Sequence, residues 1–172
     1  MDAVEMVAQL MAISATTAPK SKGENFVKTR VLTGNVLKEL ADTMLAFGQR
    51  TKKKDFDRDS KNVAESDAVL LIGLKKASVL GIDCAASGFA DSKTFQKHKK
   101  HAGEFVGPTC AYRLLDMGIA LGSAVKTASM LNVDNRIMYR VGVAEREMGL
   151  VDWEYVMGIP LSVTGKSIYI DR

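Results

Sequence analysis

Two cysteines and two serines have the spacing of the four ligands in a metal-cluster site, and the cysteines also have the right side-chain type. Cys84, Ser87 and Ser92 lie in the small-residue segment DCAASGFADS (83–92), and Cys110 is the only other cysteine. A four-iron cluster needs four thiolate ligands, commonly three from one tight loop and a fourth further along the chain. With cysteine at both serine positions the spacing would be C-x2-C-x4-C-x17-C. The sequence therefore contains half of a cluster framework.

The two serines change the chemistry of this ligand set. A hydroxyl ionises far less readily than a thiol and is a poor ligand for iron. A cluster held by one chain is therefore not expected, and the alternative is a cluster shared by two copies that each give two thiolates. In a reducing compartment we also expect no persistent disulfide between Cys84 and Cys110.

Two histidines stand in the basic run KTFQKHKKH (93–101), which also contains the sequence HKKH. Their position favours a solvated face over the base of a buried catalytic triad. A metal contact by His98 and His101 remains the alternative, because the pattern is too general to exclude it.

The segment GIPLSVTGKS (158–167) has some features of a phosphate-binding loop. That motif requires four residues between its glycines, whereas six separate Gly158 from Gly165. We therefore expect no nucleoside triphosphate in this loop. Lys166 remains a source of positive charge for a phosphate on another ligand.

Composition indicates one soluble domain over residues 1–172. The chain has 172 residues, 47% hydrophobic and 26% charged, with a net charge of +4. Its basic run 50–61 is interleaved with aspartates, and no aromatic residues are spaced to stack bases, so nucleic acid is not an expected partner. The first residues lack a basic signal-peptide region and no apolar run reaches about 18 residues, so we expect a cytoplasmic protein without a membrane span.

Hydrophobic periodicity, capping residues and turn residues predict most of the secondary structure. The predicted elements are a helix at 3–13 capped by Asp2, a strand at 24–32, a helix at 36–47 ended by Gly48, a loop at 49–62, a buried central strand at 66–74, a basic helix at 93–101, a long helix at 109–131, a turn at 134–136, a helix at 141–149 ended by Gly149, and closing strands at 153–161 and 167–170.

The long helix contains an uncharged stretch, MGIALGSAV (117–125), which predicts burial on all sides. It also carries two stripes of small residues, Gly118 with Gly122, and the alanines at 120, 124 and 128. Glycine lowers helix stability, so the two glycines indicate close approach by another group. That group is another helix, within the chain or across a dimer interface, or a flat cofactor.

Several long segments resemble, in order, a prokaryotic family of ferredoxin-domain-containing proteins of unknown function. These segments are TTAPKSKG (16–23), LLIGLK (70–75), GIDCAASGF (81–89), LDMGIALGSAVKTAS (115–129), VDNRIMYRVGVA (133–144) and GIPLSVTGKSIYIDR (158–172). The resemblance implies a four-cysteine cluster site. Cys84 and Cys110 match two of its positions, while Ser87 and Ser92 occupy the others. This copy is therefore expected to have lost its four-iron four-sulfur cluster.

The order of elements is similar to that of flavin-dependent nitroreductases. The resemblance implies an α+β fold with a sheet, flanking helices and a buried central helix, and a homodimer with flavin mononucleotide (FMN) at the subunit interface. Thr17, Lys20 and Lys22 would then hold the flavin phosphate. Gly118 and Gly122 would mark the approach to the flavin ring or to the partner subunit. On residue types alone, TTAPKSKG is equally consistent with a solvated turn.

Taken together, these features predict a redox protein that binds a flavin and passes electrons to a small-molecule partner. No residue is identified as a catalytic acid or base. The alternative is a non-enzymatic module, either a structural remnant of the cluster family or a basic protein that binds a macromolecular partner.

Overall fold

The computed structural model describes residues 2–169 and confirms the α+β class. In chain order the elements are α1 (Ala3–Thr17), the 3-10 helix η1 (Ser21–Gly23), β1 (Val27–Thr33), α2 (Asn35–Thr51), α3 (Phe56–Ala64), β2 (Ala68–Leu74), α4 (Ser92–Lys97), β3 (His101–Ala102), β4 (Val106–Gly107), α5 (Ala111–Met130), β5 (Asp134–Asn135), α6 (Tyr139–Met148) and β6 (Tyr155–Ser162). Asp2 caps α1 as predicted, because its side chain accepts a hydrogen bond from the Glu5 N–H at 2.8 Å.

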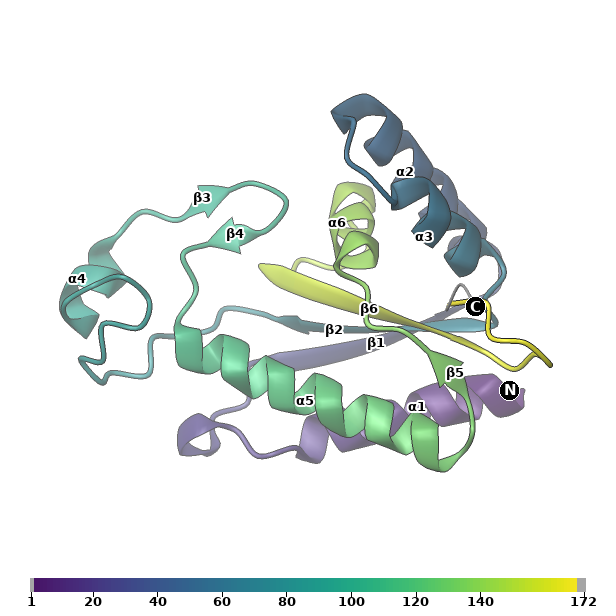
Figure 1. Ribbon diagram of the computed structural model, residues 1–172. Helices are drawn as coiled ribbons and strands as arrows, with labels where there is room; N and C mark the ends of the chain where they lie inside the picture. The colour runs from purple at the N-terminus through teal and green to yellow at the C-terminus, as the bar shows by residue number, and fades with distance from the viewer. Residues whose placement is uncertain (1, 170–172) are drawn as a thin grey trace.

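One antiparallel sheet, in the strand order β1-β2-β6-β5, divides the molecule into two layers (Figure 1). Every residue of β2 is buried. Leu70 and Ile72 pack into the apolar cluster on one face of the sheet, whereas Val69 and Leu71 pack into the cluster on the other. Burial on both faces explains the continuous apolar run and confirms the predicted central strand.

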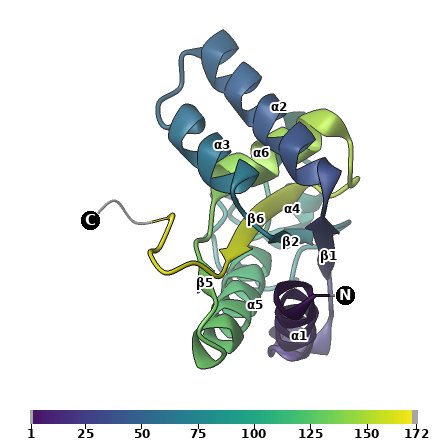
Figure 2. The ribbon, with the colours of Figure 1, turned by 90° about the vertical axis from the view of Figure 1, so that its right-hand side faces the viewer.

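Helices α1 and α5 lie side by side on one face of the sheet (Figures 1 and 2). Fully buried alanines belong to the cluster that they share, among them Ala8 and Ala15 of α1 and Ala120 and Ala124 of α5. Small side chains let two helices approach closely. The alanine stripe of α5 is therefore an ordinary packing surface within the chain.

Helices α2, α3 and α6 cover the other face (Figure 2). A Cβ atom at Gly142 of α6 would lie 1.9 Å from the carbonyl oxygen of Val156, and one at Gly158 of β6 would lie 2.1 Å from a methyl group of Val141. Neither position has room for a side chain. Helix α6 therefore rests directly on the backbone of β6.

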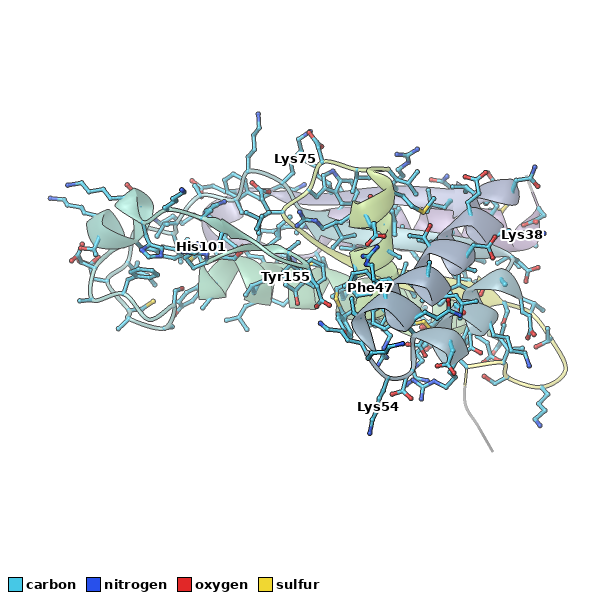
Figure 3. The ribbon with its side chains drawn as sticks, turned by 90° about the horizontal axis from the view of Figure 1, so that it is seen from above. Lys38, Phe47, Lys54, Lys75, His101 and Tyr155 are labelled. Atoms are coloured by element: carbon cyan, nitrogen blue, oxygen red, sulfur yellow. The ribbon has the colours of Figure 1, made fainter. Side chains whose placement is uncertain are left out.

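Residues 75–110, called the lobe below, connect β2 to α5 and project beyond the sheet (Figure 1). Seen from above, His101 lies in the lobe, far from Phe47 and Lys38 on α2 (Figure 3). The lobe is anchored to β6, because the rings of Phe105 and Tyr155 stack with centroids 4.2 Å apart. It also has a small core of its own, formed by Leu80, Phe95, Cys110 and their apolar neighbours.

The predicted loop at 49–62 is wrong, because α2 continues to Thr51 and α3 follows. Gly48 does not end α2 either. A Cβ atom there would lie 2.4 Å from the Cβ of Phe56, so this glycine allows α3 to pack against α2. Asp59 of α3 is buried and accepts a hydrogen bond from Arg140 of α6 at 2.8 Å. Tertiary contacts therefore stabilise a segment whose charge pattern indicates a loop.

Helix α5 has nearly the predicted limits, but burial on all sides is wrong. Its outer face is solvent-accessible, with Leu115 59% and Ile119 47% exposed. The helix packs on the sheet and on α1 through one stripe only. The absence of charge between residues 117 and 125 therefore does not reflect burial within this chain.

Three shorter predictions also differ from the structure. The predicted turn at 134–136 begins with β5, in which Asp134 and Asn135 pair with the end of β6. The basic helix predicted at 93–101 ends at Lys97. No strand is present at 167–169, and Ile170 lies outside the described residues.

None of the helices within residues 2–169 combines the length and the apolar character that a bilayer span requires.

Candidate functional site

The structure brings the four cluster-loop positions to one place in the lobe. Cys84, Ser87, Ser92 and Cys110 all line a cavity of about 10 Å³, together with Phe89, Phe95 and their neighbours. Cys84 is exposed, whereas Cys110 is buried and immediately precedes α5. Both thiols are free. The four positions therefore lie around one cavity, although only two of them carry thiols.

The residues of this cavity do not fit a four-iron cluster. The Ser87 hydroxyl oxygen accepts a hydrogen bond from the Ala111 N–H at 2.9 Å, and the Ser92 hydroxyl donates to the Ile82 carbonyl at 3.1 Å. Both serines therefore hold the loop through main-chain hydrogen bonds. A cavity of this size has room for about one water molecule. Two thiols, two engaged hydroxyls and so small a space do not suit four irons and four sulfides.

Aromatic residues hold the lobe around this cavity. The rings of Phe89 and Phe95 stack with centroids 4.6 Å apart, and His98 lies 4.9 Å from Phe89. His98 and His101 are neighbours, with ring centroids 5.7 Å apart. Within residues 2–169, no group of three or more histidine, cysteine, aspartate or glutamate side chains is placed to hold a metal ion.

Lys20 stabilises the end of α1. Its Nζ donates to three main-chain carbonyls, at distances of 2.6–2.8 Å, those of Ala15, Thr16 and Ala18. These carbonyls carry the negative end of the helix dipole, so the ammonium group is well placed there. Burial lowers the pKa of Lys20, and the nearby Asp116 carboxylate partly opposes this effect.

Lys22 and Thr17 also bind main-chain atoms. The Nζ of Lys22 donates to the Leu80 carbonyl at 2.6 Å and thereby joins the loop after α1 to the lobe. The Thr17 hydroxyl donates to the Ile13 carbonyl at 3.1 Å. Two of the three residues predicted to hold a phosphate therefore have their cationic groups directed at the chain's own carbonyls.

A buried arginine fixes the position of this loop, and the sequence analysis missed it. Arg113 is fully buried, with Nη1 3.0 Å from the Ser21 carbonyl and Nε 3.0 Å from the Ser78 carbonyl. It also forms ion pairs with Glu24 and Asp116. The Asp116 carboxylate in turn accepts from the N–H and the hydroxyl of Ser21. Two opposite charges three residues apart, directly before the uncharged stretch 117–125, were the available signal.

A groove of about 330 Å³ lies between α1 and α5. Ser14, Thr17, Ser123, Lys126 and Thr127 give it a polar lining. The hydroxyls of Ser14 and Thr127 lie 2.6 Å apart and join the two helices. Lys126 is exposed and forms no ion pair within the described residues. Of these residues only Thr17 was predicted, because the others are adjacent only after α5 packs on α1.

Gly118 and Gly122 lie on the outer face of α5, and no atom lies within 4 Å of a Cβ added at either position. No residue within the described part of the chain makes the close approach that these glycines indicate. They instead flatten an exposed apolar surface that includes Leu115, Ile119 and Met130.

Lys166 lies apart from Lys20 and Lys22. It lines a groove of about 400 Å³ next to α3, together with Lys61 and Glu65. This groove lies beyond the end of β6. Lys22 instead contacts the segment that follows β2, and the end of β2 pairs with the start of β6. The two places are at opposite ends of the sheet (Figure 1). One phosphate could not contact both within a single chain.

Helix α6 contains a buried carboxyl group that sequence reasoning did not predict. Glu145 is fully buried. Its Oε1 accepts a hydrogen bond from the Val151 N–H, while no residue within the described range donates a hydrogen bond to Oε2. Burial raises the pKa of Glu145 to about 7, although the Val151 hydrogen bond and nearby arginines oppose the shift.

The sequence has a family match and a close relative. Residues 106–172 match the family described as "Uncharacterized protein containing a ferredoxin domain (DUF2148)". An "Uncharacterized protein" of Archaeoglobus fulgidus is 46% identical over 171 residues, covering 99% of this chain and 92% of the relative. The similarity thus extends over nearly all of both proteins.

Solved structures of flavoproteins have the same fold. The FMN-dependent nitroreductase NfnB of Mycobacterium smegmatis matches with a TM-score of 0.62 and 10% identity, covering 96% of this chain and 80% of that one. A nitroreductase with bound FMN from Desulfitobacterium hafniense has a TM-score of 0.57 and 12% identity, with coverages of 97% and 81%. A BluB-like flavoprotein of Clostridium difficile has 0.55 and 18%, with coverages of 98% and 88%. The nitroreductase-like fold is therefore confirmed.

Proposed function

Because the chain belongs to the DUF2148 family of ferredoxin-domain proteins and has the nitroreductase fold, we propose that it is a flavin-binding redox protein. It binds FMN and passes electrons to a small-molecule acceptor. The observation that carries this proposal is the likeness of nearly the whole chain to FMN-dependent proteins of known structure. The flavin would supply the electron chemistry, and the chain would bind and orient it.

The groove between α1 and α5 is the proposed phosphate site. It combines the Ser123 hydroxyl with the exposed ammonium group of Lys126. The Ser14 and Thr17 hydroxyls also line it, but they already donate to the carbonyls of Leu10 and Ile13. Hydroxyl donors and a lysine ammonium are suited to phosphate oxygens. The groove volume suits the phosphate end of FMN better than the whole cofactor. Lys20 and Lys22 have a supporting role in this proposal, because they hold the adjacent loop in place.

The proposal includes a homodimer. The exposed face of α5 presents Leu115, Gly118, Ile119, Gly122 and Met130 to solvent, and Lys126 of the groove lies between the last two. The apolar part of this face, residues 115–122, is typical of helix-to-helix contact, because glycine lets the two backbones come close. A second copy seated on it would extend the open groove and cover more of a bound flavin.

FMN titration of flavin-free protein tests the cofactor. We expect saturable quenching of flavin fluorescence, with about tenfold weaker binding for Lys126→Gln because one charge-assisted hydrogen bond is lost. Lys38→Gln is the matched control, since Lys38 lies on α2 (Figure 3), which covers the face of the sheet opposite to α1 and α5 (Figure 1). Absence of quenching at about 100 μM FMN would contradict flavin binding.

Light scattering tests the dimer with a matched pair of variants. Ile119 on α5 and Leu45 on α2 are both exposed apolar residues, 47% and 38% accessible. We expect Ile119→Lys to give a monomer, because a charge would be buried in the interface, and Leu45→Lys to remain a dimer. A monomeric parent protein, or equal behaviour of the two variants, would contradict the proposed interface.

The second candidate is a non-enzymatic module that has lost its cluster. The ammonium groups of Lys20 and Lys22 favour it, because main-chain carbonyls already occupy them. This candidate predicts a colourless protein that does not take up FMN. If that is found, salt-dependent retention on heparin would separate a basic partner-binding protein from a structural remnant.

A further inference from the structure

The two cysteines of the chain line one cavity in the lobe. Cys84 and Cys110 line the same cavity of about 10 Å³, which is the size of a single water molecule. The hydrogen bond from the Ala111 N–H to the Ser87 hydroxyl oxygen, 2.9 Å long, holds residues 75–91, called the cysteine loop, against the start of α5. Cys84 lies three residues before Ser87, and Cys110 directly precedes Ala111.

The thiols differ in access to solvent. Cys84 is exposed, whereas Cys110 is 7% exposed. A reagent in solution thus meets Cys84 more readily than Cys110. An accessible thiol with a second thiol on the same cavity is an arrangement suited to sequential thiol–disulfide exchange.

The cysteine loop has no regular structure between Leu74 and Ser92, and turns hold it at several points. Ala85 and Gly88 have positive φ angles of 55° and 84°, and the Gly88 N–H donates to the Ala85 carbonyl at 2.9 Å. A disulfide requires Cα atoms within about 7 Å and a defined dihedral angle. An irregular loop can reach that geometry with less disturbance than two helices could.

A larger cavity, of about 220 Å³, leads to the same thiol. It shares Val79, Phe95 and Cys110 with the small cavity, and its wall also carries His98 and Lys100. The Lys100 ammonium lies 3.6 Å from the Glu154 carboxylate and is 44% exposed, so it could also contact a carboxylate of a small anionic molecule. The cavity therefore offers space for a low-molecular-weight disulfide beside Cys110, and the smaller cavity that Cys84 lines adjoins it through the shared residues.

We propose that Cys84 and Cys110 form a reversible redox couple that exchanges with an anionic low-molecular-weight disulfide. The Cys84 thiolate attacks one sulfur of the small disulfide, and the first small thiolate leaves. The Cys110 thiolate then attacks the Cys84 sulfur, which forms the protein disulfide and releases the second small thiolate. The protons of both cysteines end on the released thiols. The cysteines are oxidised and the small disulfide is reduced, by two electrons.

This reaction does not depend on flavin binding. It uses the two cysteines of the cluster loop. Serine at the other two positions makes an iron cluster unsuitable, so these thiols are available for another reaction. Intracellular protein disulfides are usually transient and serve catalysis or redox sensing. The couple would link the cysteine loop to the start of α5 when oxidised and release it when reduced.

Incubation of the full chain with oxidised glutathione, followed by acid quenching and intact-mass measurement, tests the proposal. In the parent protein we expect loss of both free thiols, a mass lower by two hydrogen atoms, and full reversal by reduced glutathione. Cys110→Ser should retain one glutathione as a stable mixed disulfide on Cys84. Cys84→Ser should react at least about tenfold more slowly, because its remaining thiol is buried.

Three outcomes would overturn the proposal. They are a parent protein that keeps glutathione without losing two hydrogens, one that forms only intermolecular disulfides, and one whose thiols remain free. Cys110→Ala provides a second variant if the serine variant does not fold, because alanine suits the buried site. Repeating the assay with and without FMN separates this result from the flavin proposal.

Discussion

Helices α5 and α6 pack on opposite faces of the sheet and use glycine in opposite ways. At Gly142 of α6, an added Cβ would lie 1.9 Å from the Val156 carbonyl oxygen, so the glycine is required by a contact within the chain. At Gly118 and Gly122 of α5, an added Cβ would meet nothing within 4 Å. A mid-helix glycine thus indicates close approach, but it does not say whether the approaching group belongs to the same chain.

Of the substitutions that test this comparison, Gly142→Ala should change the free energy of unfolding most. The added methyl group would collide with the backbone of β6, which cannot move aside as a flexible side chain could. We expect a loss of about 3 kcal/mol in the free energy of unfolding, at the upper end for overpacked cores. Urea denaturation measures it. A variant within about 0.5 kcal/mol of the parent would mean that α6 can shift from β6 without cost.

The buried carboxyl group of α6 is expected to make the second-largest contribution, through the pH dependence of the free energy of unfolding. Glu145 in the unfolded chain titrates near 4.5, whereas burial raises its pKa to about 7 in the folded protein. Between these values the folded state holds a proton that the unfolded state has released. The stabilisation is therefore present at low pH and is lost as the pH rises through 7, by about 2 kcal/mol between pH 5 and pH 8.

Glu145→Gln isolates this contribution. The amide cannot ionise, yet its oxygen can still accept from the Val151 N–H. We expect the pH dependence of the unfolding free energy to become flatter by that amount, whatever the stability of the variant at a single pH. Equal slopes for the parent and the variant between pH 5 and pH 8 would show that other groups cause the dependence.

The smallest effect is expected on the outer face of α5. Gly118→Ala and Gly122→Ala should each stabilise the isolated chain by about 0.5–1 kcal/mol, because alanine is the better helix former and has free space there. Urea denaturation over a range of protein concentrations measures this gain. If the gain becomes a loss at high concentration, a second copy packs on this face, and the contrast with α6 holds only within one chain.

Local sequence signals were sufficient for the elements whose limits depend on their own residues and immediate neighbours. The Asp2 cap fixed the start of α1, the apolar run located β2, and Gly149, with a φ of 68°, ended α6 as predicted. They failed for α3, whose charged sequence indicates a loop. That helix depends on Phe56 packing at Gly48 and on the pairing of Asp59 with Arg140, which are contacts between distant residues.

The sequence by itself determined the α+β class, the family resemblance and the mismatch between two thiols, two hydroxyls and an iron cluster, because these depend on residue types and their order. Only the tertiary structure decided that Lys20 and Lys22 bind main-chain carbonyls and that Lys126 joins Thr17 in one groove. It also decided that Lys166 lies elsewhere. The reason is that a long side chain selects its partner from what packing places within reach, and spacing along the chain does not specify that.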